Sequence, residues 1–249
     1  MYVVGYPESQ THWLAYLLAY CFNTEYSDLD YPNNLLQDKD LQSYLKGNLT
    51  HPSYEVDSGK VMRTNRINIA TQTKTPVIYM VRDGRDLMLC YYHKQKFPKD
   101  KSNPHIRQRT FTSKVSRKLG LEKLSTKLEL SPFSRFLHSH VSEWVSHVQT
   151  SLDNQPTAII RYEDLLAIPE ETLASLMMRL GVEVSSTIIQ QAIEIFNSQY
   201  LSQQQLIKYR KNFIGKPGDW EKYFSKQETI YFQEIAGQIL CTLGYESEI

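Results

Sequence analysis

The first eighteen residues contain the pattern that most constrains the fold of this chain. Tyr2–Val4 is a short β-prone run that Pro7 ends, and Ser9 or Thr11 is placed to cap the helix that follows. That helix has an apolar face and is therefore expected to pack against a sheet. The residues of this face are Trp13, Leu14, Leu17, Leu18 and Cys21. The chain thus begins as a strand, a tight turn and an amphipathic helix, as α/β domains do.

The turn between this strand and helix is suited to an anion. A helix N-terminus presents free backbone N–H groups and the positive end of a dipole, which favours a phosphate or sulfate group. The turn has no second glycine and no lysine, so it does not match the loop G-x-x-x-x-G-K-[ST] of nucleotide triphosphatases or the dinucleotide pattern G-x-G-x-x-G. We therefore expect a phosphorylated ligand without ATPase chemistry.

Two later segments read as strands buried in a parallel sheet. Val77–Val81 is a continuous apolar run, and Arg82 follows it at once. With a helix predicted over Leu87–Tyr92, Arg82 and Cys90 both face a ligand lying over the carboxyl edge of the sheet. A third strand is predicted over Ala158–Tyr162.

Helix signals fill the rest of the chain. One helix begins near Pro169 and ends before Gly181, a second is capped by Ser185 or Ser186, and the last runs from Gln227 to Leu243. No linker divides the 249 residues, so we expect a single α/β domain over residues 1–249, with a central parallel sheet flanked by helices.

Composition narrows the class of protein. A net charge of +1 argues against a general nucleic-acid binder. The three cysteines are widely spaced, which fits reduced thiols better than disulfides or a zinc site, and no metal is expected. Because the N-terminus has no basic n-region and no long apolar stretch, we expect a cytoplasmic protein without a membrane anchor.

Four segments together resemble one family in order and spacing. They are YPESQTHWL, VIYMVRDGRDLMLCYYH, IIRYEDLLAIPEETLASLMMRLGV and FIGKPGDWEKYF. They are similar to the cytosolic-type sulfotransferases, which move a sulfuryl group from 3′-phosphoadenosine 5′-phosphosulfate (PAPS) to an acceptor and release 3′-phosphoadenosine 5′-phosphate (PAP). The resemblance implies a phosphate-binding strand–loop–helix at the N-terminus, a small-molecule acceptor and no metal.

The resemblance also implies which residues bind the donor. The phosphosulfate is expected on the N-terminal loop, the 3′-phosphate at Arg82 with Cys90 in place of the usual serine, and the adenine near Trp13, Tyr162 and, by a looser alignment, Phe196. A glycine-rich loop further along is expected near the 3′-phosphate. Phe213-Ile214 stand there in place of the usual Arg-Lys pair, so the charge is expected from Arg210, Lys211 or Lys216. The implied set is Pro7, Ser9, Gln10, Thr11, His12, Trp13, Arg82, Cys90, Tyr162, Phe196, Lys211, Gly215 and Lys216.

The chain departs from the family at the chemistry. Glu8 stands where the family has the lysine that neutralises the leaving phosphate, and Asn65 stands where it has the histidine base. A carboxylate ~4 Å from the phosphosulfate would be repelled by roughly 4 kcal/mol at an effective dielectric of about 20. Glu8 must therefore point away, bind a cation or serve the acceptor.

Two main interpretations follow. In the first, Glu8 is the general base, while His12, Arg63 or Arg66 offsets charge on the leaving group. In the second, the chain is a degenerate PAP- or PAPS-binding regulatory protein. A nucleotide kinase is a third, weaker alternative, because magnesium-ligand motifs are missing.

A basic segment separates the second and third predicted strands. Ten lysines and arginines stand against three acidic residues over Lys96–Leu130. Residues 97–130 are interpreted either as a lid over the acceptor or as a solvated surface insertion. The sequence leaves the acceptor's identity, the choice between hydroxyl and amine, and the oligomeric state open.

Overall fold

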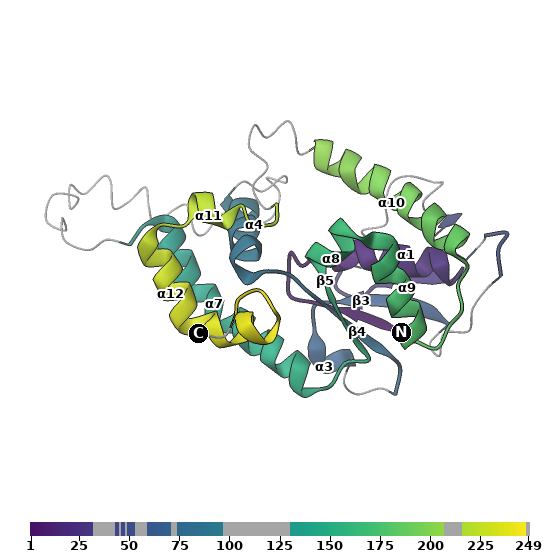
Figure 1. Ribbon diagram of the computed structural model, residues 1–249, viewed down its shortest axis with the longest axis horizontal. Coiled ribbons are helices and arrows are strands. Elements are labelled where there is room, and N and C mark those ends of the chain that lie inside the picture. Colours follow the sequence, from purple (N-terminus) through teal and green to yellow (C-terminus); the bar gives the residue numbers. More distant parts are fainter. Residues whose placement is uncertain are drawn as a thin grey trace, which may run out of the picture.

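The computed structural model describes residues 1–31, 43–44, 46–47, 49–52, 59–70, 74–96, 130–206 and 216–247 (Figure 1). The predicted lid over residues 97–130 lies outside the described residues except for Leu130, as do Lys211 and Gly215.

Five parallel strands form the central sheet, in the order β2-β3-β1-β4-β5. The strands are β1 (Tyr2–Val4), β2 (Glu25–Asp28), β3 (Lys60–Thr64), β4 (Val77–Val81) and β5 (Ala158–Arg161). Since consecutive parallel strands need a crossover, helical segments between them cover the sheet. The predicted α/β architecture is confirmed.

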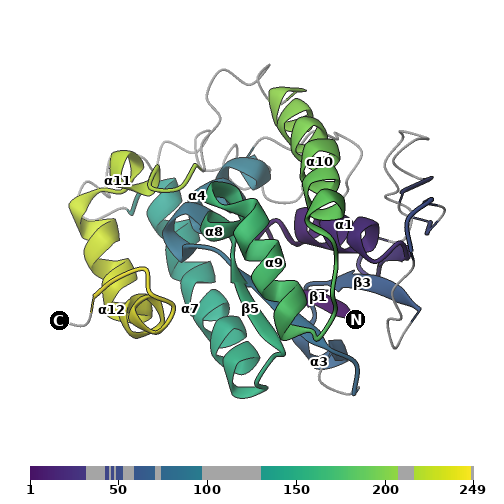
Figure 2. The same ribbon diagram turned by 45° about the vertical axis from the view of Figure 1, so that its right-hand side comes forward.

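Helices cover both faces of the sheet (Figures 1 and 2). The first group, on one face, consists of α1 (Thr11–Cys21), α8 (Tyr162–Ala167), α9 (Pro169–Arg179) and α10 (Ser186–Leu206). The second group, on the other, consists of α3 (Ile67–Ala70), α4 (Gly84–Lys96), α7 (Pro132–Asp153) and α12 (Lys226–Thr242), with the short α11 (Trp220–Tyr223) beside α4. None of the helices in the described part of the chain is both long and apolar enough to cross a membrane.

Side chains alternate between the two faces of the sheet along each strand and so contribute to two hydrophobic cores. Val3, Ile78 and Met80 face the first group of helices, while Val4 and Tyr79 face the second. All five side chains are buried, because successive residues of a strand point to opposite faces and both faces are covered. This explains why β1 and β4 read as uninterrupted apolar runs.

Some predicted boundaries are wrong. Strand β5 ends at Arg161, and Tyr162 already belongs to α8, whose first turn contains two acidic residues that favour a helix start. Neither Ser9 nor Thr11 caps α1; the N-cap is Gln10 in the left-handed region, and its side chain makes no capping bond. Helix α4 starts before the predicted Leu87 and extends past Tyr92.

The connections that follow β1 and β4 define where a ligand can bind. The chain leaves β1 into α1 on one face of the sheet, and leaves the neighbouring β4 into α4 on the other face. Open α/β sheets bind ligands outside the carboxyl ends of strands at such a switch point. The loop after β1 and Arg82, which follows β4, meet there.

Candidate functional site

The loop between β1 and α1 is tightly turned. Glu8 and Gln10 have φ values of 72° and 65°, in the region that side chains other than glycine rarely adopt. The loop starts at Gly5, where a Cβ would lie 2.6 Å from the carbonyl oxygen of Met80, so glycine is required. Such turns direct backbone N–H groups outward, and residues in rare conformations concentrate at functional sites. The loop and the N-terminus of α1 therefore form a candidate anion site.

Arg82 joins the end of β4 to this loop. Its side chain is 1% exposed, its Nη1 donates to the carbonyl oxygen of Glu8 at 3.1 Å, and its guanidinium lies 4.7 Å from the ring centre of Tyr162. A buried charge requires partners, and a planar guanidinium suits a phosphate. Arg82 lies beside the loop as expected, and its role at a phosphate group stays a prediction.

Glu8 is paired with a cation from α4. Its Oε1 lies 2.6 Å from Nζ of Lys94, and Cys90 Sγ donates to Oε2 at 3.9 Å. Desolvation opposes the charge on Lys94, but the Glu8 carboxylate raises the pKa of this lysine above its usual value. Burial raises the pKa of the Cys90 thiol. The carboxylate therefore binds a cation, which is one of the three outcomes expected from the sequence.

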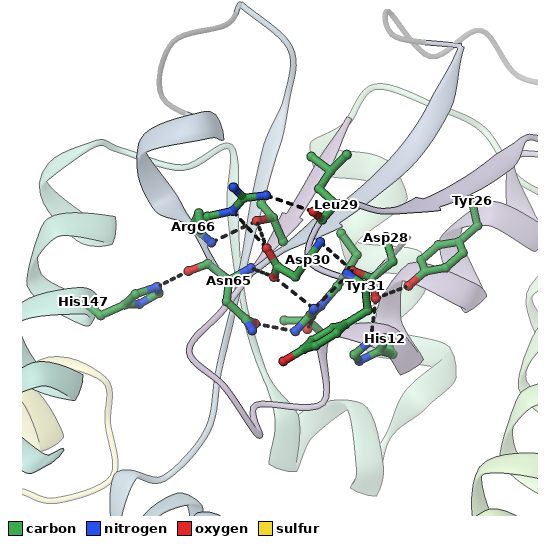
Figure 3. A network of polar contacts seen from close by, with 12 residues as sticks. His12, Tyr26, Asp28, Leu29, Asp30, Tyr31, Asn65, Arg66 and His147 are labelled. Carbon is green, nitrogen blue, oxygen red and sulfur yellow. Dashed lines mark hydrogen bonds and ion pairs between the residues drawn. The ribbon is translucent and has the colours of Figure 1, made fainter. Parts of the chain in front are cut away.

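A second polar network lies on the other side of the loop (Figure 3). Arg63 is 3% exposed; its Nε donates to Thr11 Oγ1 at 2.9 Å, and its Nη1 lies 3.4 Å from Asp28 and 3.1 Å from Asp30. Asp30 also accepts from the backbone N–H of Asn65 at 2.6 Å. Arg63 thus ties the start of α1 to the ends of β2 and β3.

His12 and Asn65, two of the candidate catalytic residues, belong to this network. Nε2 of His12 lies 2.8 Å from Asp28 Oδ2, and Arg63 donates to Oδ1 of Asn65. Burial alone would raise the pKa of Asp28, but the hydrogen bond from His12 and the charge of Arg63 lower it. An amide cannot act as a base at neutral pH, and the contacts of Asn65 tie the segment after β3 to Arg63, Asp30 and His147.

His147 was missed by the sequence reasoning. It comes from α7, with Nε2 2.9 Å from the carbonyl oxygen of Asn65 and Nδ1 3.0 Å from the Tyr79 hydroxyl (Figure 3 shows the contact with Asn65). Burial lowers the pKa of His147 even though the bond to Asn65 opposes this. Both ring nitrogens are engaged, so His147 supports the segment after β3. Helix α7 was not predicted, although Ser131 and Pro132 form a standard helix start.

The predicted aromatic residues are divided between two places. Trp13 and Tyr162 contact each other edge-on with ring centres 6.2 Å apart, and Arg82 lies over Tyr162. Phe196 packs instead on Tyr16, with ring centres 5.8 Å apart, further along α1. Trp13 and Tyr162 therefore lie beside the Arg82 site, whereas Phe196 lies further along α1, and all three side chains are buried in the same core.

The glycine-rich loop is fastened to the start of α4. The backbone N–H groups of Gly218 and Trp220 donate to the two carboxylate oxygens of Asp86 at 2.7 and 2.9 Å. Arg85 stacks over the Trp220 ring at 4.0 Å. Lys216, at the start of the described part of this loop, is exposed. The loop is thereby held to the helix that follows Arg82.

The structure brings most of the predicted site residues to one edge of the sheet. Pro7, Ser9, Gln10 and Thr11 lie in the loop or at the start of α1. Lys94 was missed, although its position four residues after Cys90 places both on one face of α4 and could have revealed it.

Comparisons with known proteins agree with this geometry. The family model described as the sulfotransferase domain matches residues 1–244. Mouse sulfotransferase SULT7A1, solved with PAP, is 16% identical, with a TM-score of 0.60 over 96% of this chain and 83% of that one. Retinol dehydratase, solved with PAP and either androsterone or retinol, is 19% identical, with a TM-score of 0.51 over 96% of this chain and 80% of that one. A search of curated proteins found no match. The match over nearly the whole chain means that this protein belongs to the sulfotransferase domain family.

Proposed function

We propose that this protein transfers the sulfuryl group of PAPS to a hydroxyl or amine of a small-molecule acceptor. The observation that carries the proposal is the contact between Arg82 and the carbonyl oxygen of Glu8, which couples a buried guanidinium to the anion-binding loop. A ligand with two separate phosphate groups suits a site with two separate anion-binding elements.

The residues of the site fit this donor. The loop and the uncapped N-terminus of α1 would hold the phosphosulfate through backbone N–H groups. Arg82, with Lys216 from the glycine-rich loop, would hold the 3′-phosphate, and Trp13 with Tyr162 would flank the adenine. The negative charge of Glu8 in this loop is balanced by Lys94, so the carboxylate does not by itself exclude an anionic donor.

The chemistry needs a group that accepts the acceptor's proton. Asn65 is an amide, His147 has both nitrogens in hydrogen bonds, and His12 is tied to Asp28. Glu8 is therefore proposed as the general base, which removes the proton from the acceptor hydroxyl or amine as the bond to sulfur forms.

A small-molecule acceptor is supported by analogy. Retinol dehydratase, which shares the fold, is solved with retinol and with androsterone.

A transfer assay tests the proposal. The protein would be incubated with sulfur-labelled PAPS and a panel of hydroxyl and amine acceptors, with Glu8→Gln in parallel. We expect labelled product from the wild type and a loss of about a hundredfold or more in Glu8→Gln, the range typical of a missing general base. PAP binding without turnover on any acceptor would favour a second candidate function, that of a binding protein that has lost transfer. This candidate is supported by Glu8 and Asn65, which stand where the family has its lysine and its histidine.

A further inference from the structure

The ion pair between Glu8 and Lys94 connects the anion-binding loop to α4. The two side chains differ in exposure to solvent: that of Glu8 is 13% exposed, and that of Lys94 is 68% exposed. Glu8 is also fixed through its backbone, because Arg82 donates to its carbonyl oxygen. An enclosed, fixed carboxylate therefore holds an exposed lysine whose long side chain can move.

We propose that Lys94 is the cation that neutralises the leaving phosphate in this protein, and that Glu8 holds it at the loop until the donor binds. The inference rests on the proposed function, since it assigns the charge that the PAPS reaction needs and that the loop itself lacks. The positive charge would then come from α4 rather than from the loop.

Arg63, another cation near the loop, already binds other groups. Arg63 is 3% exposed and is bound to Thr11, Asp28, Asp30 and Asn65. The guanidinium of Arg63 would have to abandon two carboxylates to reach a donor. Such a buried pair is costly to break, because it leaves uncompensated charges in the interior.

Lys94 can change partners at little cost. Among the described residues its only ion pair is the one with Glu8, and an ion pair at an exposed lysine adds little stability. A phosphosulfate on the loop would present several anionic oxygens to the ammonium. Once Lys94 moves to those oxygens, the Glu8 carboxylate is released from its ion pair and can accept the acceptor's proton.

The transfer step then balances. The acceptor oxygen or nitrogen forms a bond to sulfur while the bond from sulfur to the bridging oxygen breaks, and that electron pair stays on the leaving phosphate. Glu8 takes the acceptor's proton and later returns it to solvent. Lys94 remains protonated throughout and stabilises the charge that develops on the leaving phosphate.

Equilibrium binding of PAP provides a readout that does not depend on turnover. Lys94→Gln should weaken PAP binding roughly tenfold or more, equivalent to about 1.4 kcal/mol, because Glu8 is left unbalanced beside the anion. Glu8→Gln should tighten PAP binding by a similar factor. The double variant should return to within roughly threefold of the wild type, since its net charge at the loop is again unchanged.

Matched variants sharpen the test. Lys74→Gln removes an exposed lysine that precedes β4. This lysine lies at the amino ends of the strands, away from the candidate site at their carboxyl ends, so the change should leave PAP binding unchanged. Lys94→Arg keeps the charge and should retain most of the PAP affinity. The rate of single-turnover transfer should be largely kept in Lys94→Arg and lowered in Lys94→Gln. Circular dichroism would verify that each variant is folded.

The outcomes separate the inference from the function it rests on. Opposite signs for the two single variants support the exchange of partners by Lys94. If Glu8→Gln and Lys94→Gln both weaken PAP binding, the pair only fixes the loop and the inference is wrong, although the proposed function stands. A wild type that binds no PAP would overturn the proposed function itself.

Discussion

Asp86 is expected to give the protein a specific dependence of stability on pH. The side chain is 1% exposed, and burial, with the charge on Asp83 added, raises its pKa to about 6 even though the N–H groups of Gly218 and Trp220 oppose this. Each carboxylate oxygen of Asp86 accepts from one N–H group of the glycine-rich loop, so the buried carboxylate holds this loop. The loop's attachment therefore has a cost in stability.

The magnitude follows from the pKa difference. The folded pKa of about 6 lies roughly 2 units above the reference value of 3.8, and each unit corresponds to about 1.36 kcal/mol. Because the folded state binds the proton more tightly than the unfolded state, the free energy of unfolding falls as pH rises from about 4 to about 6. Asp86 should thus contribute a loss of about 3 kcal/mol across this window.

Urea unfolding of Asp86→Asn at several pH values between 4 and 7 measures this contribution. The difference in unfolding free energy between wild type and variant should change by about 3 kcal/mol, with the wild type losing stability relative to the variant as pH rises. Asp164→Asn, whose side chain is 51% exposed, is the control and should run parallel to the wild type. Parallel curves for wild type and Asp86→Asn would refute the reasoning.

Two further predictions concern backbone positions. In Gly84→Ala the new Cβ would lie 2.6 Å from Cη2 of the fully buried Trp144. This overpacking should cost about 1–3 kcal/mol and lower the melting temperature by about 2–10 °C. Gly237→Ala in α12 is the control: its nearest contacts are with the flexible Gln233 side chain, so it should not lower the melting temperature. Gln10→Gly should stabilise the fold by about 0.5–1 kcal/mol in thermal unfolding, because φ is 65° there, and an equal gain in Gln10→Ala would contradict that explanation.

Three strands of the sheet and its first helix could be predicted because their residues follow strong local rules, whereas β2 and β3 were missed. The apolar runs at Tyr2–Val4 and Val77–Val81 are strands at those bounds, as the buried position of a parallel sheet requires. Strand β2 (Glu25–Asp28) escaped prediction because it lies at an edge of the sheet and has polar residues throughout. Its assignment depends on pairing with β3, which sequence patterns do not contain.

The candidate site was predictable in composition but not in its pairings. Position along the chain pointed to Glu8 and Arg82, since each follows a buried strand. The partners of Glu8 and His12 come from 86 and 16 residues away, so these two pairings could not be assigned without the fold. The spacing from Cys90 could place Lys94 on the right face of α4, but it could not show that this lysine reaches Glu8. His12 is paired with Asp28, and its role as a cation for the leaving group stays a prediction.

Calorimetric titration with PAP, compared with adenosine 5′-monophosphate, tests the central claim most directly. Charge-assisted hydrogen bonds from Arg82 to the 3′-phosphate should contribute about 1.5–3 kcal/mol, so PAP should bind the wild type about 10- to 150-fold more tightly than the nucleotide without that phosphate. Arg82→Lys, which keeps the charge but loses the planar fork, should remove most of this difference. Equal affinity of the wild type for both nucleotides would contradict the account of a PAPS-binding sulfotransferase.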